Sequence, residues 1–301
     1  MTNTILCVGA LTMDTIFRLE ELPTRSGKFI PLEAVEVAEG MASAQAASIV
    51  RLGGVARLWA SAGDDTTGDR LISQLSAQGV DCASVRRARG ARSGFSSIFM
   101  DLTGERIIVP HYDVALRATP DSLPPMDDVA LVSTDARWPD AAEMALSEAK
   151  KRGIPGLLDA DVASYEILAR LAPLASHIVA SEPGAAVLTG VDDPTKAILL
   201  LAQRYEGFVA ITAGERGCFW FHRDTGQVRH APAPKVRAID TLAAGDVFHA
   251  AFAQGLLEKL ETETLIRRAS AAAAIKCTRF GGRLGAPTKQ ELDAFLAEVE
   301  F

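Results

Sequence analysis

Short aliphatic runs alternate with helical patterns along most of this 301-residue chain, and glycines separate many of them. A helix between two strands returns the chain to the same end of a sheet, so strands in such an alternation run parallel. The sequence therefore predicts an α/β fold whose mostly parallel sheet is covered by helices on both faces. The predicted strands are residues 5–9, 55–61, 129–133, 154–159, 177–180 and 208–212, with a hairpin at 217–222 and 227–230; the predicted helices are 40–52, 68–78, 140–151, 245–259, 262–276 and 289–298.

Two segments depart from this alternation. Residues 15–36 contain short alternating strands around Pro23 and Gly27, and residues 92–109 read as a hairpin with its turn at 101–104. Alternation of apolar and polar residues is typical of antiparallel strands that expose one face to solvent. We therefore expect these segments to form a small separate sheet.

Charge and cysteine content exclude several classes of partner. The net charge is −7 and no basic cluster is present, so nucleic acid is not an expected partner. The four cysteines lie far apart without a C-x-x-C pair, which fits a reducing cytoplasm rather than a zinc or disulfide framework. The chain has neither a signal-peptide pattern nor an apolar run long enough to span a membrane. We therefore expect a cytoplasmic location and no membrane contact.

The most specific motif joins a turn of small residues to a carboxylate. Ala243, Ala244 and Gly245 precede Asp246 at the start of a predicted small-residue helix. The free amides of a first helical turn can hold phosphate oxygens, and small side chains let a phosphoryl group approach closely. A carboxylate placed there can take a proton from an incoming hydroxyl. The residues alone fit both a phosphoryl-transfer site and an N-capping aspartate on a buried helix.

In their order along the chain, these segments resemble the ribokinase-like (PfkB) carbohydrate kinases. The family's D-T-x-G-A-G-D signature is matched by D-T-L-A-A-G-D at 240–246, and its T-x-G-x-x-G turn by residues 212–217. Gly9 and Asp14 match the family's first strand and its sugar-binding aspartate. The G-D-x-x-G segment and the small-residue helix before the last glycine motif are matched at 63–69 and 271–282.

The resemblance implies a three-layer α/β/α sandwich with a small β-sheet lid. Residues 1–301 would form one kinase domain, and the lid would comprise about 14–37 and 91–112. The implied activity is ATP-dependent, with Mg²⁺, and phosphorylates a primary hydroxyl of a sugar. Lids of this family pair between subunits, so the resemblance also implies a homodimer.

The resemblance assigns a role to each matching residue. Asp246 would be the general base, and the amides of Ala243, Ala244 and Gly245 would form the anion hole. The residues implied to bind ATP are Thr212, Gly214, Gly217, Thr241, Ala274, Cys277 and Gly281, and those implied to bind the sugar are Asp14, Gly27, Lys28, Gly40, Arg137 and His111.

Within the family, segments such as P-T-R-S-G-K at 23–28 are most similar to those of sulfofructose kinases. Lys28 and Arg137 match positions beside an anionic sugar end, and such cations suit a sulfonate or phosphate. The alternative is a solvated Lys28 and an Arg137 that pairs with Asp135 or Asp140. Pro110 stands where those enzymes carry an asparagine, and His111 is the candidate substitute. A fructose-like or other ketose acceptor therefore stays equally open.

Other positions depart from the family pattern. Ala44 replaces the asparagine of the G-G-x-x-x-N sugar motif, and Glu39, in place of its first glycine, can face the pocket or be solvated. The N-x-x-E motif tied to Mg²⁺ has become S-E-P-G at 181–184, which leaves Glu182 to act through water or simply to favour a helix N-terminus. Ala243 replaces a glycine, and an alanine amide still donates, so the chemistry survives if this position has a negative φ.

Two alternative functions remain at this stage. A nucleoside kinase of the same fold needs an aromatic platform for a base. The lid offers Phe17, Phe29, Phe95 and Phe99, whose alternation predicts a lid core instead. A catalytically inactive sugar or nucleotide sensor is the other alternative, and the retention of Asp246 argues against it.

Overall fold

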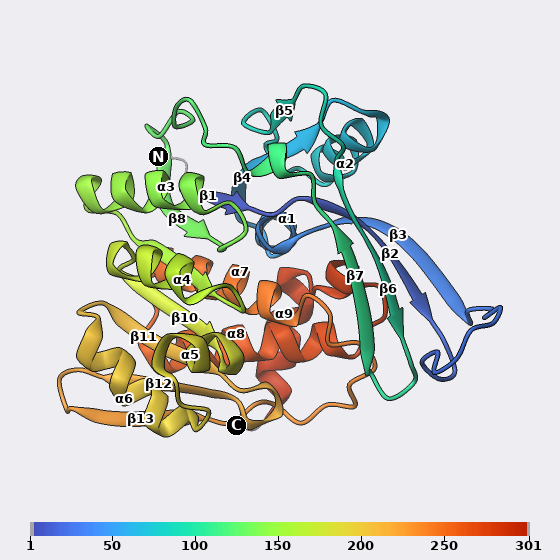
Figure 1. The fold of residues 1–301 in the computed structure, drawn as a ribbon. Coiled ribbons are helices and arrows are strands. Elements are labelled where there is room, and N and C mark those ends of the chain that lie inside the picture. The colour runs from blue at the N-terminus through green and yellow to red at the C-terminus, as the bar shows by residue number, and fades with distance from the viewer. Residues whose placement is uncertain (1–2, 300–301) are drawn as a thin grey trace.

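The computed structural model describes residues 3–299 and contains one large and one small sheet (Figure 1). The large sheet has the order β13-β12-β11-β10-β9-β8-β1-β4-β5. Its strands from β11 to β5 pair in parallel, and β12 and β13 add an antiparallel hairpin at one edge. The strands are β1 (Thr4–Gly9), β4 (Val55–Gly63), β5 (Arg86–Ala88), β8 (Val129–Thr134), β9 (Gly156–Ala160), β10 (His177–Ser181), β11 (Phe208–Thr212), β12 (Cys218–His222) and β13 (Gln227–Ala231).

Helices cover both faces of the large sheet, because its aliphatic strands are buried on both sides. One core cluster packs the sheet against α1 (Met41–Arg51), α2 (Thr66–Ser76), α7 (Ala244–Leu257), α8 (Thr262–Cys277) and α9 (Lys289–Glu298). The other packs it against α3 (Pro139–Arg152), α4 (Tyr165–Leu171), α5 (Glu182–Thr189) and α6 (Pro194–Arg204). The predicted three-layer α/β/α fold is thereby confirmed.

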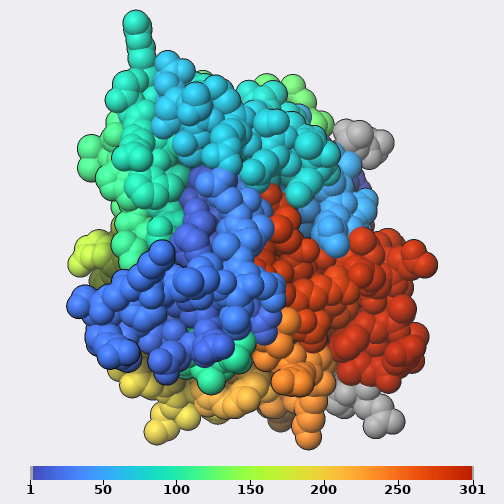
Figure 2. Space-filling view, turned by 90° about the vertical axis from the view of Figure 1, so that its right-hand side faces the viewer, coloured from blue at the N-terminus to red at the C-terminus, as the bar shows by residue number. Residues whose placement is uncertain are grey.

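The small sheet forms a lid over one side of the sandwich. It has the order β3-β2-β6-β7, with β2 (Thr12–Arg18), β3 (Glu33–Glu39), β6 (Gly94–Met100) and β7 (Arg106–His111). Ile16, Val37 and Ile98 of its inner face are buried against Leu242 and Phe280. Figure 2 shows the N-terminal lid segment, in blue, against the orange and red C-terminal segments. The lid therefore rests on the 240–246 motif and on the segment that follows α8.

The lid's phenylalanines do not form its buried core. Phe17 and Phe99 stack with ring centroids 5.5 Å apart, and both alternate with the buried Ile16 and Ile98. Strand neighbours point to opposite faces, so the phenylalanines lie on the outer face. The expectation of a phenylalanine core in the lid was therefore wrong.

Within residues 3–299, no helix is long and apolar enough to cross a membrane. The sequence did not predict α4 and α6. The seven-residue α4 is too short for a clear periodic pattern. α6 follows the N-cap Asp193 and starts at Pro194, and this start signal was overlooked in the sequence.

Candidate active site

The 240–246 motif forms the turn that leads into α7. Asp246 lies in the first turn of that helix, where the amides have no helical partners. Ala243 is the N-cap residue and adopts φ 59°, in the left-handed region. The condition of a negative φ at Ala243 is therefore not met, and the side chain costs about 1 kcal/mol relative to glycine there. Strained backbone conformations of this kind are common in active sites and ligand-binding sites.

Asp246 is surrounded by other carboxylates. Burial raises its pKa well above the ordinary value, and the nearby charges of Asp159, Glu39 and Asp135 raise it further. A carboxylate with a raised pKa is a stronger base once ionised. The environment therefore suits Asp246 for accepting a proton.

A buried network of polar side chains connects the start of α7 to α1, β8 and β9. Gln45 donates from Nε2 to Asp159 Oδ2 at 2.9 Å, and Ser133 donates to Gln45 Oε1 at 2.7 Å. His249, one turn after Asp246, places Nδ1 2.8 Å from the Gly245 carbonyl and 3.4 Å from Asp159 Oδ2. Sequence reasoning missed this network, because its members come from α1, β8, β9 and α7.

Asp240 ties the turn to the end of α8. Its carboxylate accepts hydrogen bonds from the amides of Leu242, Gly281 and Gly282 at 2.7–2.9 Å. Its Oδ2 also lies 3.0 Å from the ammonium of Lys276, and both side chains are fully buried. The amides of Ile239 and Asp240 donate to the Cys277 carbonyl. The predicted nucleotide residues Thr241, Cys277 and Gly281 are thus brought together, with Ala274 one turn earlier on α8.

The other predicted nucleotide residues lie at the carboxyl end of β11. Thr212 ends that strand, and Gly214 and Gly217 form the turn into β12. Gly217 has φ 87°, and a Cβ there would lie 2.1 Å from the Ala231 carbonyl oxygen. Ligands of open α/β sheets bind outside the carboxyl ends of the strands, which is where this turn lies.

Asp14, on the inner face of the lid, has a carboxylate oxygen that accepts no hydrogen bond from the described residues. It interacts with Thr12 and Ser96, and its Oδ1 is buried without a hydrogen-bond partner among residues 3–299. Burial raises its pKa to about 6. An unsatisfied buried oxygen is costly, so a sugar hydroxyl that donates to it would be well bound.

Glu39 is buried rather than solvated. It accepts a hydrogen bond from the Arg283 amide at 2.7 Å, while the Arg283 guanidinium donates to Ala38 and Gln78. Burial raises the pKa of Glu39 to about 8 against the attraction of Arg283. Glu39 therefore joins the lid to the segment after α8 as a mostly neutral carboxylic acid at pH 7.

Replacing Glu39 with Gln should reduce the loss of stability as the pH rises. The pKa of Glu39 rises from 4.5 to about 8 on folding, so between these values the folded state binds the extra proton. Its stability then falls with rising pH by up to about 1.4 kcal/mol per unit. Melting temperatures of the wild type and Glu39→Gln are measured from pH 5 to 9. The difference between the two melting temperatures should change between pH 5 and 8 and stay constant above pH 8. A difference that is constant over the whole range would contradict a neutral Glu39.

Arg137 and Tyr112 are two further polar residues close enough to interact electrostatically, and the charge of Asp14 also acts on Tyr112. The Arg137 amide donates to Asp135 at 2.7 Å, and its guanidinium donates to the Val162 carbonyl and lies 3.8 Å from Asp161. Asp140 pairs with Arg170 instead, so the proposed Arg137–Asp140 pair does not form. Charges on Asp14 and Arg137 act on the phenol of Tyr112, whose ring lies beneath the Arg117 guanidinium. Sequence reasoning missed Tyr112.

The remaining predicted sugar residues are placed differently. His111 is exposed and packs with its ring tilted against Phe95, on the lid face opposite Asp14, so this geometry does not support His111 as a sugar ligand. Gly27 and Lys28 lie in an exposed loop at the lid's end. Gly40 caps α1 with φ 104°, and a Cβ there would lie 2.7 Å from the Ala10 carbonyl oxygen, so the position requires glycine.

Glu182 is engaged elsewhere. It starts α5 and forms an ion pair with Arg216. Asp161 is another carboxylate whose charge acts on Asp246, and it accepts a hydrogen bond from Ser181 at 2.7 Å. No cluster of three metal-ligating side chains occurs within the described part of the chain. The geometry does not support Glu182 as the residue that assists the metal.

A buried carboxylate in the first turn of a helix, directly after a turn of small residues, is an arrangement that suits phosphoryl transfer to an alcohol. The model of the pfkB family carbohydrate kinases matches residues 2–289. The chain therefore belongs to this family and is an ATP-dependent carbohydrate kinase of ribokinase-like fold.

The relatives are similar over nearly their whole lengths. Ribokinase of Haemophilus influenzae is 27% identical over 98% of this chain and 99% of its own. A crystal structure from Agrobacterium tumefaciens, provisionally described as a ribokinase, is 44% identical with a TM-score of 0.95, over 99% of this chain and 98% of that one. The Arabidopsis thaliana ribokinase complexed with ribose and ATP shares the fold, at 21% identity and a TM-score of 0.82 over 98% and 99% of the two chains.

Proposed function

We propose that this kinase transfers the γ-phosphoryl group of ATP to a primary hydroxyl of a ketose-like sugar, and that the sugar carries an anionic group such as the sulfonate of sulfofructose. The observation that supports the anionic acceptor is the Arg137 guanidinium. It is one-third exposed, lies beside Tyr112 and is only loosely paired with Asp161 at 3.8 Å. A planar guanidinium matches the oxygens of a sulfonate or phosphate.

In the proposed reaction, the acceptor oxygen forms a bond to the γ-phosphorus. The bond from that phosphorus to the β–γ bridging oxygen breaks, and its electron pair leaves with ADP. The Asp246 carboxylate takes the proton of the hydroxyl. The amides of Ala244 and Gly245, with that of Ala243, hold the transferring group's oxygens. Closure of the lid excludes water as a competing acceptor.

Mg²⁺ fits this site as a partner of the nucleotide. Kinase Mg²⁺ is held mainly by phosphate oxygens and waters with one or two carboxylates, so a dedicated protein cluster is not needed. Asp161 is the carboxylate we assign to those waters, because it acts on Asp246 and retains an oxygen beyond its bond from Ser181. When bound, Mg²⁺ would neutralise part of the negative charge of the phosphates.

Replacing Arg137 with Ala should lower kcat/KM for an anionic ketose by about 10- to 100-fold, as expected for a lost charge-assisted hydrogen bond. Neutral fructose should lose only a few-fold. A coupled assay across fructose, fructose phosphates, sulfofructose, 2-keto-3-deoxygluconate and nucleosides measures both. Arg170→Ala is the matched control, because Arg170 pairs with Asp140 and Glu143 on the surface. Equal losses on anionic and neutral sugars would remove the anion-binding role.

The two alternatives have less support. A nucleoside kinase needs an aromatic platform, but Phe17, Phe95 and Phe99 lie on the outer face of the lid and Phe29 is largely exposed. An inactive sensor does not require the strained backbone at Ala243 or a proton acceptor beside it. The assay above includes nucleosides as an explicit test.

We also propose a cytoplasmic homodimer, since ATP is the donor and the lid has an open edge. β7 is one of the two edge strands of the lid, and Ile107 and Val109 on its outer face are 42% and 55% exposed. A second copy would cover this apolar surface. Light scattering should give a dimer mass for the wild type and a monomer mass for Val109→Lys. Val114→Lys, at another exposed valine outside the lid sheet, should stay dimeric. A monomeric wild type at micromolar concentration would refute the dimer.

A further inference from the structure

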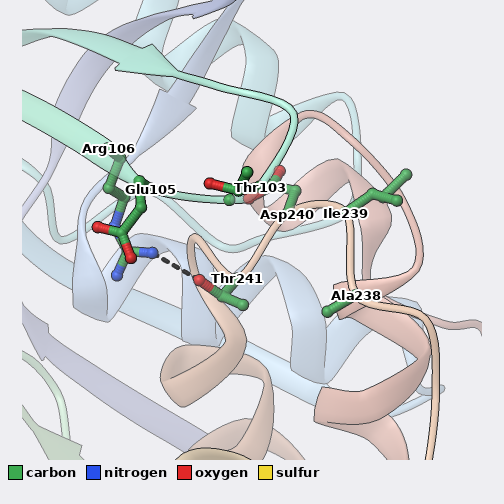
Figure 3. Close-up of a pocket in the computed structure, with 8 residues that line it drawn as sticks. Thr103, Glu105, Arg106, Ala238, Ile239, Asp240 and Thr241 are labelled. Atoms are coloured by element: carbon green, nitrogen blue, oxygen red, sulfur yellow. Dashed lines mark hydrogen bonds between the residues drawn. The ribbon is translucent and has the colours of Figure 1, made fainter. Parts of the chain in front are cut away.

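The lid touches the phosphate-holding turn through one arginine. Arg106, the first residue of β7, donates from Nη1 to Thr241 Oγ1 at 2.5 Å (Figure 3). Around this contact the lid turn at 103–106 and the segment 238–241 line a cavity of about 440 Å³. A cationic side chain of the lid therefore lies next to residues 238–241, the segment that leads into Ala243 and Asp246.

Arg106 differs from the other cations near this turn. Lys276 is buried against Asp240, and Arg283 is held by Ala38 and Gln78. Arg18, on the same lid face, is paired with Glu33. The Arg106 side chain is exposed and bonds a neutral hydroxyl, which contributes only about 1 kcal/mol. Phosphate oxygens can therefore replace that hydroxyl at little cost.

The register of the lid links Arg106 to the sugar-binding face. Asp14 pairs with Ser96, and four residues further along β6 Met100 pairs with Arg106. An even spacing places the side chains of Ser96 and Met100, and those paired with them, on one face, about 13 Å apart. One face of the sheet thus carries Asp14, the proposed sugar ligand, at one end and Arg106, beside Thr241, at the other. The charge of Arg106 also acts on the Cys277 thiol at the end of α8, among the predicted nucleotide residues.

We propose that Arg106 is a catalytic residue that the lid supplies to the transferring phosphoryl group. In the ATP complex its guanidinium leaves the Thr241 hydroxyl and binds oxygens of the γ-phosphoryl group. An arginine in this role stabilises the charge that develops as the bond to the bridging oxygen breaks. The inference rests on phosphoryl transfer at Asp246 and not on which sugar accepts the group.

The chain has a physical need for such a cation. Its net charge is −7, and the charges of Asp159, Asp135 and Asp161 act on Asp246. A cation carried by the lid compensates this charge only when the lid is closed over the sugar. Closure of the lid over the acceptor sugar then also brings Arg106 to the phosphoryl group.

The test compares Arg106→Gln with the wild type in turnover and in nucleotide binding. We expect kcat to fall by about 100- to 1,000-fold at saturating substrates. Calorimetry should show at least about a tenfold loss of affinity for the non-hydrolysable ATP analogue AMP-PCP and less than about a twofold loss for ADP, because only AMP-PCP carries the γ group. Arg106→Lys should recover part of both losses. Arg18→Gln, which removes another arginine from the same lid face, should stay within about twofold of the wild type.

Equal loss of AMP-PCP and ADP affinity, or a kcat within about threefold of the wild type, would overturn the proposal and leave Arg106 as a latch on Thr241. Circular dichroism and melting temperature establish that each variant is folded. The binding measurement needs no acceptor, so it tests Arg106 even if the wild type phosphorylates none of the proposed sugars; that outcome would count against the acceptor proposal alone.

Discussion

Replacing Asp246 with Asn is expected to lower kcat by about 1,000-fold while ATP binding stays within a few-fold of the wild type. Asparagine keeps the size of the side chain but cannot take the hydroxyl proton, and general-base catalysis supplies a factor of this order. It also removes one charge from the carboxylates around Asp159, so the nucleotide phosphates meet no new repulsion. Steady-state kinetics and calorimetric titration with ATP measure the two quantities separately.

A matched control distinguishes catalysis from helix capping. Asp193 is the N-cap of α6 and accepts a hydrogen bond from the Lys196 amide at 2.9 Å. Asp193→Asn keeps a good cap and should leave kcat unchanged. If Asp246→Asn behaved like this control, Asp246 would be a structural residue at the start of α7 and the proposed base would be refuted.

Replacing Lys276 with Met should destabilise the protein by about 3–5 kcal/mol. The Lys276–Asp240 pair is fully buried, and removing the ammonium leaves the Asp240 carboxylate without its counter-charge. Part of the loss should be recovered in the double variant with Asp240→Asn, because the uncompensated charge is then gone. Chemical unfolding monitored by circular dichroism gives the free energies.

The exposed pair between Lys289 and Asp293 provides the comparison. Its side chains are 59% and 53% exposed, so Lys289→Met should cost less than about 1 kcal/mol. Similar losses for Lys276→Met and Lys289→Met would show that the buried pair does not hold the phosphate turn to α8.

The parts of the fold that follow local rules were predictable. Buried aliphatic strands and amphipathic helices are set by periodicity, and the elements from β8 to α3 and from α7 to α9 lie within two residues of their predicted bounds. The 240–246 motif was recognisable because its turn, amides and carboxylate are adjacent in sequence. Its conformation was not, since tertiary contacts hold Ala243 at a positive φ that local preference disfavours.

Contacts between distant segments could not be read from the sequence. Glu39 meets Arg283, Asp159 meets Gln45, and Arg106 meets Thr241 only after β3, β9 and the lid take their places. Alternation in the lid strands also leaves the buried face ambiguous, because isoleucines occupy one face and phenylalanines the other. His111 was assigned to the sugar from its position next to Pro110, which carries no information about the face on which its side chain lies.

The most direct test of the central claim follows the phosphorus itself. ATP labelled in its γ-phosphoryl group is incubated with the enzyme and an anionic ketose, and ³¹P NMR identifies the labelled product. We predict that the label appears in a phosphate ester of the sugar's primary hydroxyl, and that Asp246→Asn forms none of this ester on the same timescale. Label found only in inorganic phosphate, or an ester formed equally fast by Asp246→Asn, would contradict the account.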